Sequence, residues 1–187
     1  MQSAKTCIAT FNLQVLTLTV SRAGNGAGTV TSVPAGINCG ADCTESYNFG
    51  AQVTLTAVPD TGSVFAGWSG DSDCSDGVVT MQSAKSCVAT FNLQVLTLTV
   101  SRAGNGVGTV TSVPAGITCG ADCTEGYNFG TQVTLTATPN TGSVFADWSG
   151  DPDCSDGVVT MQSAKTCTAT FNPVSYTHLT LPTNREV

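Results

Sequence analysis

An internal repeat of eighty residues constrains this chain more than any other feature of its sequence. The heptapeptide at residues 1–7 returns at residues 81–87 with one change and at residues 161–167 without change. Residues 14–92 and 94–172 differ at only ten positions. Because repeats this alike adopt the same fold, the organisation of one unit predicts that of the next.

The repeat divides the chain into four segments. Residues 1–12 match the end of a unit, so we expect them to be the end of a truncated upstream repeat. Residues 13–92 and 93–172 are two complete β-repeat modules. The repeat register is lost from residue 173 onward, and we expect residues 173–187 to be an unstructured tail that is not native to the repeat. A genuine carboxy-terminal tail is the alternative.

Within a module, apolar residues recur at every second position. Leu16, Leu18 and Val20 alternate with polar residues, and the same pattern covers residues 53–57. A period of two predicts strands with one buried face, and no window supports a long amphipathic helix. The dipeptide at residues 25–26, Asn-Gly, lies between the first two expected strands and predicts a tight hairpin there.

These patterns predict an all-β fold. We expect tandem small modules with antiparallel or mixed sheets, either β-grasp-like or sandwich-like. Almost no linker separates the last expected strand of one module from the first strand of the next. We therefore expect an extended rod of neighbouring repeats rather than freely jointed modules.

Each complete module contains four cysteines, and a ninth lies at Cys7. Four cysteines permit three pairings, of which we favour pairing the first with the second and the third with the fourth. A zinc site with four cysteine ligands is the alternative, but a gap of twelve residues between the last two is poor spacing for it. The cysteines are Cys39, Cys43, Cys74 and Cys87 in the first module and Cys119, Cys123, Cys154 and Cys167 in the second.

Disulfides favour an oxidising compartment, so we expect the protein outside the cell or on its surface. Acidic residues outnumber basic ones by thirteen to six, and the basic residues are scattered singly. This argues against nucleic acid as a partner. No apolar run approaches the roughly twenty residues that a membrane helix needs, so we expect no membrane segment here.

Several ordered motifs resemble a known family. They are the Leu-Thr-Leu-Thr-Val run, Gly-x-Gly-Thr-Val-Thr-Ser-x-Pro-Ala-Gly-Ile, Cys-Gly-x-x-Cys, Gly-Ser-x-Phe-x-x-Trp-Ser-Gly and the closing Ala-Thr-Phe. Together they are similar to the divergent InlB B-repeat family of bacterial surface repeats, over roughly residues 1–172. The resemblance implies a compact β module, exposure outside the cell and a stalk or adhesive role. It gives no catalytic residues to carry over, and we expect no cofactor.

Nucleophilic catalysis needs a base, and the only histidine is His178 in the expected tail. We therefore predict that the protein is not an enzyme. Residues 24–28, Gly-Asn-Gly-Ala-Gly, are similar to a dinucleotide-binding loop, but no helix is expected after them, so a turn is favoured.

An acidic loop is the candidate site for a metal. Clustered carboxylates beside a glycine turn suit Ca²⁺, although the spacing is not that of an EF-hand loop. Asp and Ser are also common turn residues, and an ordinary acidic loop is the favoured interpretation. The candidate ligands are Asp71, Asp73 and Asp76 and, in the second module, Asp151, Asp153 and Asp156.

Trp68 and Trp148 are the candidate ligand-binding residues. Each lies three residues after a Phe and directly before Ser-Gly-Asp. An exposed Trp stacks well on a sugar ring, whereas a Trp packed in the core is the commoner case and the one we favour. We thus expect a non-catalytic stalk, spacer or adhesin module. The alternative is a ligand-binding module that meets a host or cell-surface glycan or protein through the Trp-Ser-Gly-Asp loop, with or without Ca²⁺.

The cysteine count generates a first prediction. If each module pairs its own four cysteines, Cys7 alone remains as a free thiol. Titration of the native protein with a thiol reagent under non-reducing conditions should find one reactive thiol per chain. Slow disulfide-linked dimerisation through Cys7 should follow. A count of zero or of several thiols would contradict this assignment.

Overall fold

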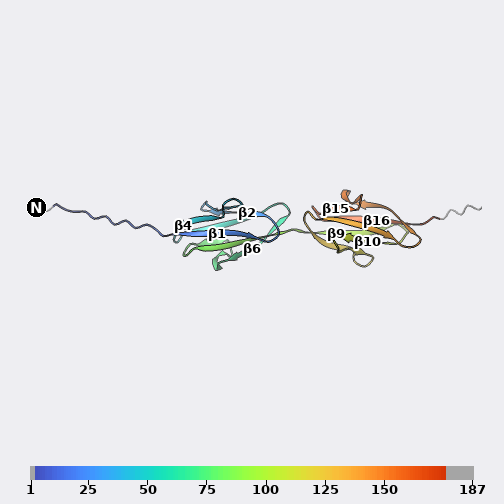
Figure 1. The fold of residues 1–187 in the computed structure, drawn as a ribbon, viewed down its shortest axis with the longest axis horizontal. Coiled ribbons are helices and arrows are strands. Elements are labelled where there is room, and N and C mark those ends of the chain that lie inside the picture. Colours follow the sequence, from blue (N-terminus) through green and yellow to red (C-terminus); the bar gives the residue numbers. More distant parts are fainter. Residues whose placement is uncertain (1–2, 176–187) are drawn as a thin grey trace, which may run out of the picture. The chain divides into compact units, whose positions relative to one another are not determined.

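The computed structural model describes residues 3–175 and divides the chain into two compact units, Met1–Gln94 and Val95–Val187. Each unit contains two four-stranded β-sheets (Figure 1). The strands of the first unit are β1 (Val15–Ala23), β2 (Gly28–Val33), β3 (Asn38–Cys39), β4 (Thr44–Asn48), β5 (Gln52–Pro59), β6 (Ser63–Gly70), β7 (Val78–Thr80) and β8 (Lys85–Leu93). Those of the second are β9 (Val95–Ala103), β10 (Gly108–Val113), β11 (Thr118–Cys119), β12 (Thr124–Asn128), β13 (Gln132–Pro139), β14 (Ser143–Gly150), β15 (Val158–Thr160) and β16 (Lys165–Pro173).

The two sheets of a unit differ in their topology. One has the strand order β4-β1-β8-β6, in which β1 and β8 are parallel and the other neighbours antiparallel. The other has the order β3-β2-β5-β7 and is wholly antiparallel. The second unit repeats both orders, as β12-β9-β16-β14 and β11-β10-β13-β15. The expected all-β fold with mixed and antiparallel sheets is therefore confirmed.

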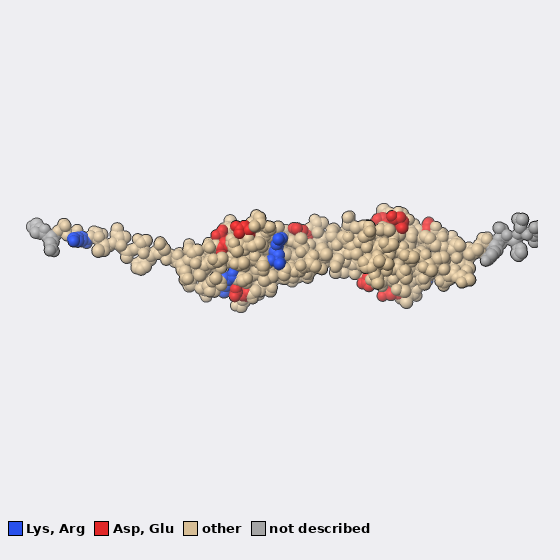
Figure 2. All heavy atoms as spheres, viewed as in Figure 1, with Lys and Arg blue, Asp and Glu red and all other residues tan. Residues whose placement is uncertain are grey.

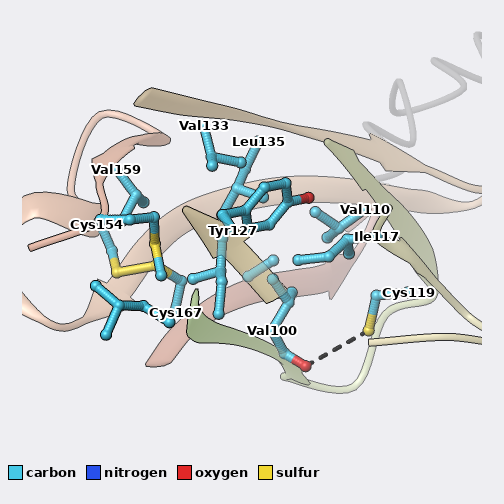
Figure 3. Packing of buried hydrophobic residues seen from close by; sticks show 14 of the residues in the cluster. Val100, Val110, Ile117, Cys119, Tyr127, Val133, Leu135, Cys154, Val159 and Cys167 are labelled. Atoms are coloured by element: carbon cyan, nitrogen blue, oxygen red, sulfur yellow. Dashed lines mark hydrogen bonds between the residues drawn. A yellow bond between two sulfur atoms is a disulfide. The ribbon is translucent and has the colours of Figure 1, made fainter. Parts of the chain in front are cut away.

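Both sheets of a unit contribute to one apolar core. Leu18 of β1, Val53 of β5 and Phe91 of β8 are each exposed by 1% or less. The intervening threonines of these strands lie on the outer faces, as the period of two predicts. Figure 3 shows the equivalent core of the second unit, where Val133 and Leu135 pack beside Tyr127. Of the two predicted architectures, the sandwich-like one is observed.

The predicted hairpin at residues 25–26 is wrong. β1 and β2 belong to different sheets, so the chain crosses from one layer to the other at this turn. The turn is instead attached to the last strand of the unit. The Gly26 N–H donates to the Phe91 carbonyl at 2.9 Å, and the Leu93 N–H donates to the Asn25 side-chain oxygen at 2.9 Å.

This attachment explains the glycines of the turn. Gly24 has a φ of +92°, and a Cβ atom built there would lie 1.9 Å from the Phe91 carbonyl oxygen. A Cβ at Gly28 would lie 2.3 Å from the Phe91 ring. Glycine is therefore required because the turn packs directly on the backbone and side chain of β8.

Helical structure in residues 3–175 is limited to two short 3₁₀ turns, η1 (Ser72–Cys74) and η2 (Pro152–Cys154). No helix in this part of the chain has the length and apolar character needed to traverse a bilayer.

The two ends of the described chain differ in their structure. Residues 3–14 form no helix or strand, and Ile8 and Phe11 are 88% and 92% exposed. At the other end, β16 extends to Pro173, and the Val174 N–H donates to the Gly142 carbonyl at 2.9 Å. The prediction of an unstructured tail is thus wrong for Pro173 and Val174, because backbone hydrogen bonding continues past the end of the repeat. Residues 176–187 lie outside the described part of the chain.

The close approach of the turn to β8 yields a second prediction, tested by a matched pair of variants. Gly24 and Gly50 both have positive φ, at +92° and +82°, but nothing lies within 4 Å of a Cβ at Gly50. Gly50→Ala should lower the free energy of unfolding by about 1 kcal/mol, the cost of left-handed backbone alone. Gly24→Ala should lower the free energy of unfolding by about 1–3 kcal/mol more, because the added Cβ overlaps the Phe91 carbonyl. Urea unfolding curves measure both, and equal effects would show that the turn does not rest on β8.

Candidate functional site

The segment from Trp68 to Cys87 contains every candidate site residue of the first module apart from the Cys39–Cys43 pair. It runs from β6 through η1 and β7 into β8. The second module repeats it from Trp148 to Cys167 with the same elements, β14, η2, β15 and β16. The two copies provide an internal check on each contact.

A β-bulge in β6 decides where Trp68 lies. Phe65 is paired with Phe91 and Trp68 with Ala89, while the register shifts between Phe65 and Gly67. Residues three apart on a regular strand point to opposite faces, but the one extra residue returns Trp68 to the face of Phe65. Sequence reasoning missed this bulge, although the unusual Phe-x-x-Trp spacing is its signature.

Trp68 consequently packs on the core rather than standing free. Its ring lies 5.3 Å from that of Phe65, which in turn lies 5.6 Å from Phe91. The equivalent distances from Phe145 to Trp148 and to Phe171 are 5.3 and 5.9 Å. Gly77, with a φ of +77°, closes the other side, since a Cβ there would lie 2.9 Å from the indole nitrogen of Trp68. Trp68 is half-buried, so part of the indole remains accessible.

The cysteines form the pairs that the sequence analysis favoured. Cys74 bonds to Cys87 with a Cα–Cα distance of 5.6 Å, and Cys39 bonds to Cys43 at 4.2 Å. The second unit has the same two bridges, Cys119–Cys123 and Cys154–Cys167 (Figure 3 shows the latter). Cys7 is free and exposed.

The Cys74–Cys87 bridge follows from the topology. Gly70, the last residue of β6, is paired with Cys87, and η1 begins two residues later. The 3₁₀ turn therefore carries Cys74 back over the strand that contains its partner. Both sulfur-bearing residues are fully buried. By loop entropy the two bridges of a module should contribute about 3 and about 2 kcal/mol, the longer loop giving the larger share.

The three aspartates of the acidic loop each have a different partner. Asp71 accepts a hydrogen bond from the Ser86 N–H at 2.7 Å, and Asp76 accepts one from the Val78 N–H at 2.9 Å. Asp73 forms an ion pair with Lys85 at 3.1 Å. Asp151, Asp156 and Asp153 repeat these three interactions in the second unit. The carboxylates thus hold the turn and the strands beside it.

This arrangement bears on the Ca²⁺ alternative. Within residues 3–175, no group of three or more His, Cys, Asp or Glu side chains lies close enough together to hold a metal ion. A Ca²⁺ ion needs six or more oxygen ligands directed at one point. The aspartates are instead directed at separate backbone and side-chain donors.

Lys85 also affects the titration of Asp73. Burial raises the pKa of this carboxyl, but the hydrogen bond and the positive charge of Lys85 lower it, as do the backbone donors of Asp73 and Thr80. The net pKa lies below the ordinary value of 3.8. The charged form of Asp73 is therefore the form that the fold stabilises.

Charged residues are sparse elsewhere as well. On the face shown in Figure 2, acidic and basic atoms form small, separate groups among uncharged residues.

One concave feature was missed by sequence reasoning. A groove of about 550 Å³ lies between the end of β1, the turn at residues 24–28 and the Cys39–Cys43 loop. Its one charged side chain, Arg22, donates a hydrogen bond to the Gly28 carbonyl at 2.8 Å. The second unit has an equivalent groove of about 460 Å³, in which Val107 replaces Ala27. The Gly-x-Gly-x-Gly pattern is the one signal in the sequence, and it favours a turn over a dinucleotide-binding loop without indicating a groove.

The family model of the divergent InlB B-repeat domain matches residues 16–94 and 96–175. No curated protein sequence matches the chain. Among solved structures, the major pilin protein T-13 of Streptococcus pyogenes is 10% identical with a TM-score of 0.34, and the match covers 86% of this chain and 97% of that chain. The shaft pilin spaA of Lactobacillus rhamnosus GG is 8% identical with a TM-score of 0.28, covering 89% and 99%. Likeness this distant carries no inference about this protein.

The lowered pKa of Asp73 gives a third prediction. A carboxyl whose folded-state pKa is depressed stabilises the fold above its unfolded pKa, and this contribution is lost as the pH falls through 3.8 towards the lower folded value. The difference in unfolding free energy between the native protein and Asp73→Asn should therefore shrink between about pH 5 and pH 2.

Asp60→Asn is the matched control, because Asp60 is exposed and the second module has Asn140 at this position. It removes the same charge without removing an ion pair. Denaturant unfolding at a series of pH values measures both variants. A stability difference for Asp73→Asn that does not change with pH would contradict the assigned role.

Proposed function

The chain belongs to the divergent InlB B-repeat family, and on this basis we propose that its modules are non-catalytic structural repeats that act as a spacer in a protein exposed outside the cell. The observation that carries the proposal is the use of the candidate site residues within each module. In the first module Asp71, Asp73 and Cys74 are each linked to β8, and Trp68 packs on Phe65 at the edge of the core. Asp76 and the Cys39–Cys43 pair hold the loops in which they lie.

The near-identity of the modules supports the same role. The two units have the same strand orders, the same four half-cystines and the same ion pair. Each has its own core cluster, so adding a module adds a complete folded unit. Repetition of this kind suits a spacer, whose length is set by the number of units.

The proposed location rests on the disulfides. Four bridges in a chain of 187 residues suit an oxidising environment, because cytosolic reductants keep thiols reduced. Small modules with modest cores also gain most from such covalent links.

A second candidate function is ligand binding through the Trp-Ser-Gly-Asp loop. Trp68 and Trp148 are only half-buried, and the Ser and Gly residues that follow each of them are exposed. A partly accessible indole in each of two modules suits repeated weak contacts with a cell-surface glycan or a host protein. Adhesion of this type would add to the structural role rather than replace it.

One experiment separates the two functions and is our fourth prediction. A reporter domain that binds a large soluble ligand is displayed on a cell surface through no module, one module or both modules. We expect capture of the ligand to increase with each module, because each adds a folded unit between the reporter and the surface.

The matched variant is Trp68→Ala with Trp148→Ala. If the modules act as a spacer, this variant should have lower thermal stability than the native modules. At a temperature where the variant is still folded, capture should still increase with the number of modules. Capture that is independent of module number would contradict the spacer function. Binding of glycans or host matrix by cells that display the modules without the reporter, abolished by the Trp variant, would establish the second candidate.

A further inference from the structure

The turn at residues 25–26 and its copy at residues 105–106 are chemically reactive sequences in nearly identical surroundings. Both are Asn-Gly, and both asparagines are exposed to water. In both units the glycine N–H donates to the last strand, from Gly26 to the Phe91 carbonyl at 2.9 Å and from Gly106 to the Phe171 carbonyl at 2.8 Å.

One hydrogen bond distinguishes the two copies. In the first unit the Leu93 N–H donates to the side-chain oxygen of Asn25 at 2.9 Å. Eighty residues on, Leu93 is replaced by Pro173, and proline has no N–H to donate. The Asn105 carboxamide therefore lacks the donor that holds Asn25.

The backbone around the two positions is otherwise the same. Leu93 is paired with Ser63, and Pro173 is paired with Ser143. The next residue along the chain also makes the same bond in each unit, since Gln94 donates to Gly62 at 2.8 Å and Val174 to Gly142 at 2.9 Å. Replacement by proline has thus removed one donor without displacing the strand.

Asn-Gly sequences undergo a known intramolecular reaction. The backbone nitrogen of the glycine attacks the side-chain carbonyl carbon of the asparagine, forming a five-membered succinimide and releasing ammonia. The proton lost from the glycine nitrogen passes through solvent to the leaving amine. Water then opens the ring at either carbonyl, giving aspartate or isoaspartate. Glycine favours the reaction because it has no Cβ to hinder the attack.

We propose that Asn105 is a site of spontaneous deamidation in the folded chain and that Leu93 protects Asn25 from the same reaction. The attack requires the carboxamide to rotate towards the glycine nitrogen. The bond from Leu93 opposes this rotation in the first unit, and nothing equivalent is available from Pro173 in the second.

The product would disturb the turn in which it forms. A Cβ at Gly104 would lie 2.1 Å from the Phe171 carbonyl oxygen, and one at Gly106 would lie 2.7 Å from the backbone of Asn172. Isoaspartate lengthens the backbone by one methylene, and this turn has no space for it. The modification should therefore loosen the attachment of the turn to the end of β16 and lower the stability of the second unit.

The fifth prediction is tested on the intact chain, folded and non-reduced, kept at mildly alkaline pH. Peptide mapping by mass spectrometry follows the two Asn-Gly sites over time. Loss of one hydrogen bond should make Asn105 react roughly 3–10 times faster than Asn25. In denaturant the two rates should converge, because the protecting bond exists only in the folded state.

Two reciprocal substitutions test whether the hydrogen bond from Leu93 causes the difference in deamidation rate. Pro173→Leu restores the donor and should slow Asn105 to the rate of Asn25, whereas Leu93→Pro removes it and should accelerate Asn25. Ala27→Val serves as the control, because it gives the first turn the neighbour found in the second, Val107. This variant should leave the rate at Asn25 unchanged.

Equal rates at the two sites in the folded native chain would overturn the proposal. So would an unchanged rate at Asn105 in Pro173→Leu, whatever the behaviour of Leu93→Pro. Acceleration of Asn25 by Ala27→Val would assign the difference to the neighbouring side chain and equally overturn it.

Discussion

The last strand of each module holds the rest of the module in place. β8 lies between β1 and β6, and its inward residues Cys87, Ala89 and Phe91 are almost completely buried. Its backbone also receives the turn at residues 24–26, and one of its cysteines is bonded to η1. A strand that arrives last in the chain therefore completes one sheet, fixes the crossing to the other sheet and anchors the acidic loop.

The sequence pattern predicts the strands correctly wherever the local period agrees with the tertiary environment. Leu16, Leu18 and Val20 alternate with polar residues, and β1 forms there with its apolar residues directed towards the core. Alternation cannot reveal which strands are neighbours. Asn25 and Gly26 suit a hairpin, but their local preference is overridden by bonds to Phe91 and Leu93, more than sixty residues away. Long-range pairing of this kind leaves no trace in a short window of sequence.

For the same reason, only part of the candidate site could be predicted from the sequence. The cysteine pairs were favoured because each repeat contains an even number of cysteines, and this number can be read without knowing the three-dimensional structure. The place of Trp68 depends on a bulge of one residue, and the groove beside Arg22 depends on the approach of the turn at residues 24–28 to the Cys39–Cys43 loop and to Phe91. Asp71, Asp73 and Asp76 form a cluster in sequence, yet each is directed at its own partner, because a loop that passes between strands exposes several backbone donors to nearby carboxylates.

The parallel pairing of β1 with β8 has a mechanical consequence. In parallel strands the chain enters the module at the start of β1 and leaves it at the opposite end, after β8. Tension applied through the chain therefore pulls these two strands lengthwise in opposite directions. The hydrogen bonds that join residues 18–23 to residues 85–90 are strained simultaneously, in shear, instead of being opened one after another as in a zipper. A module built in this way resists traction along its own chain better than its small core alone would suggest.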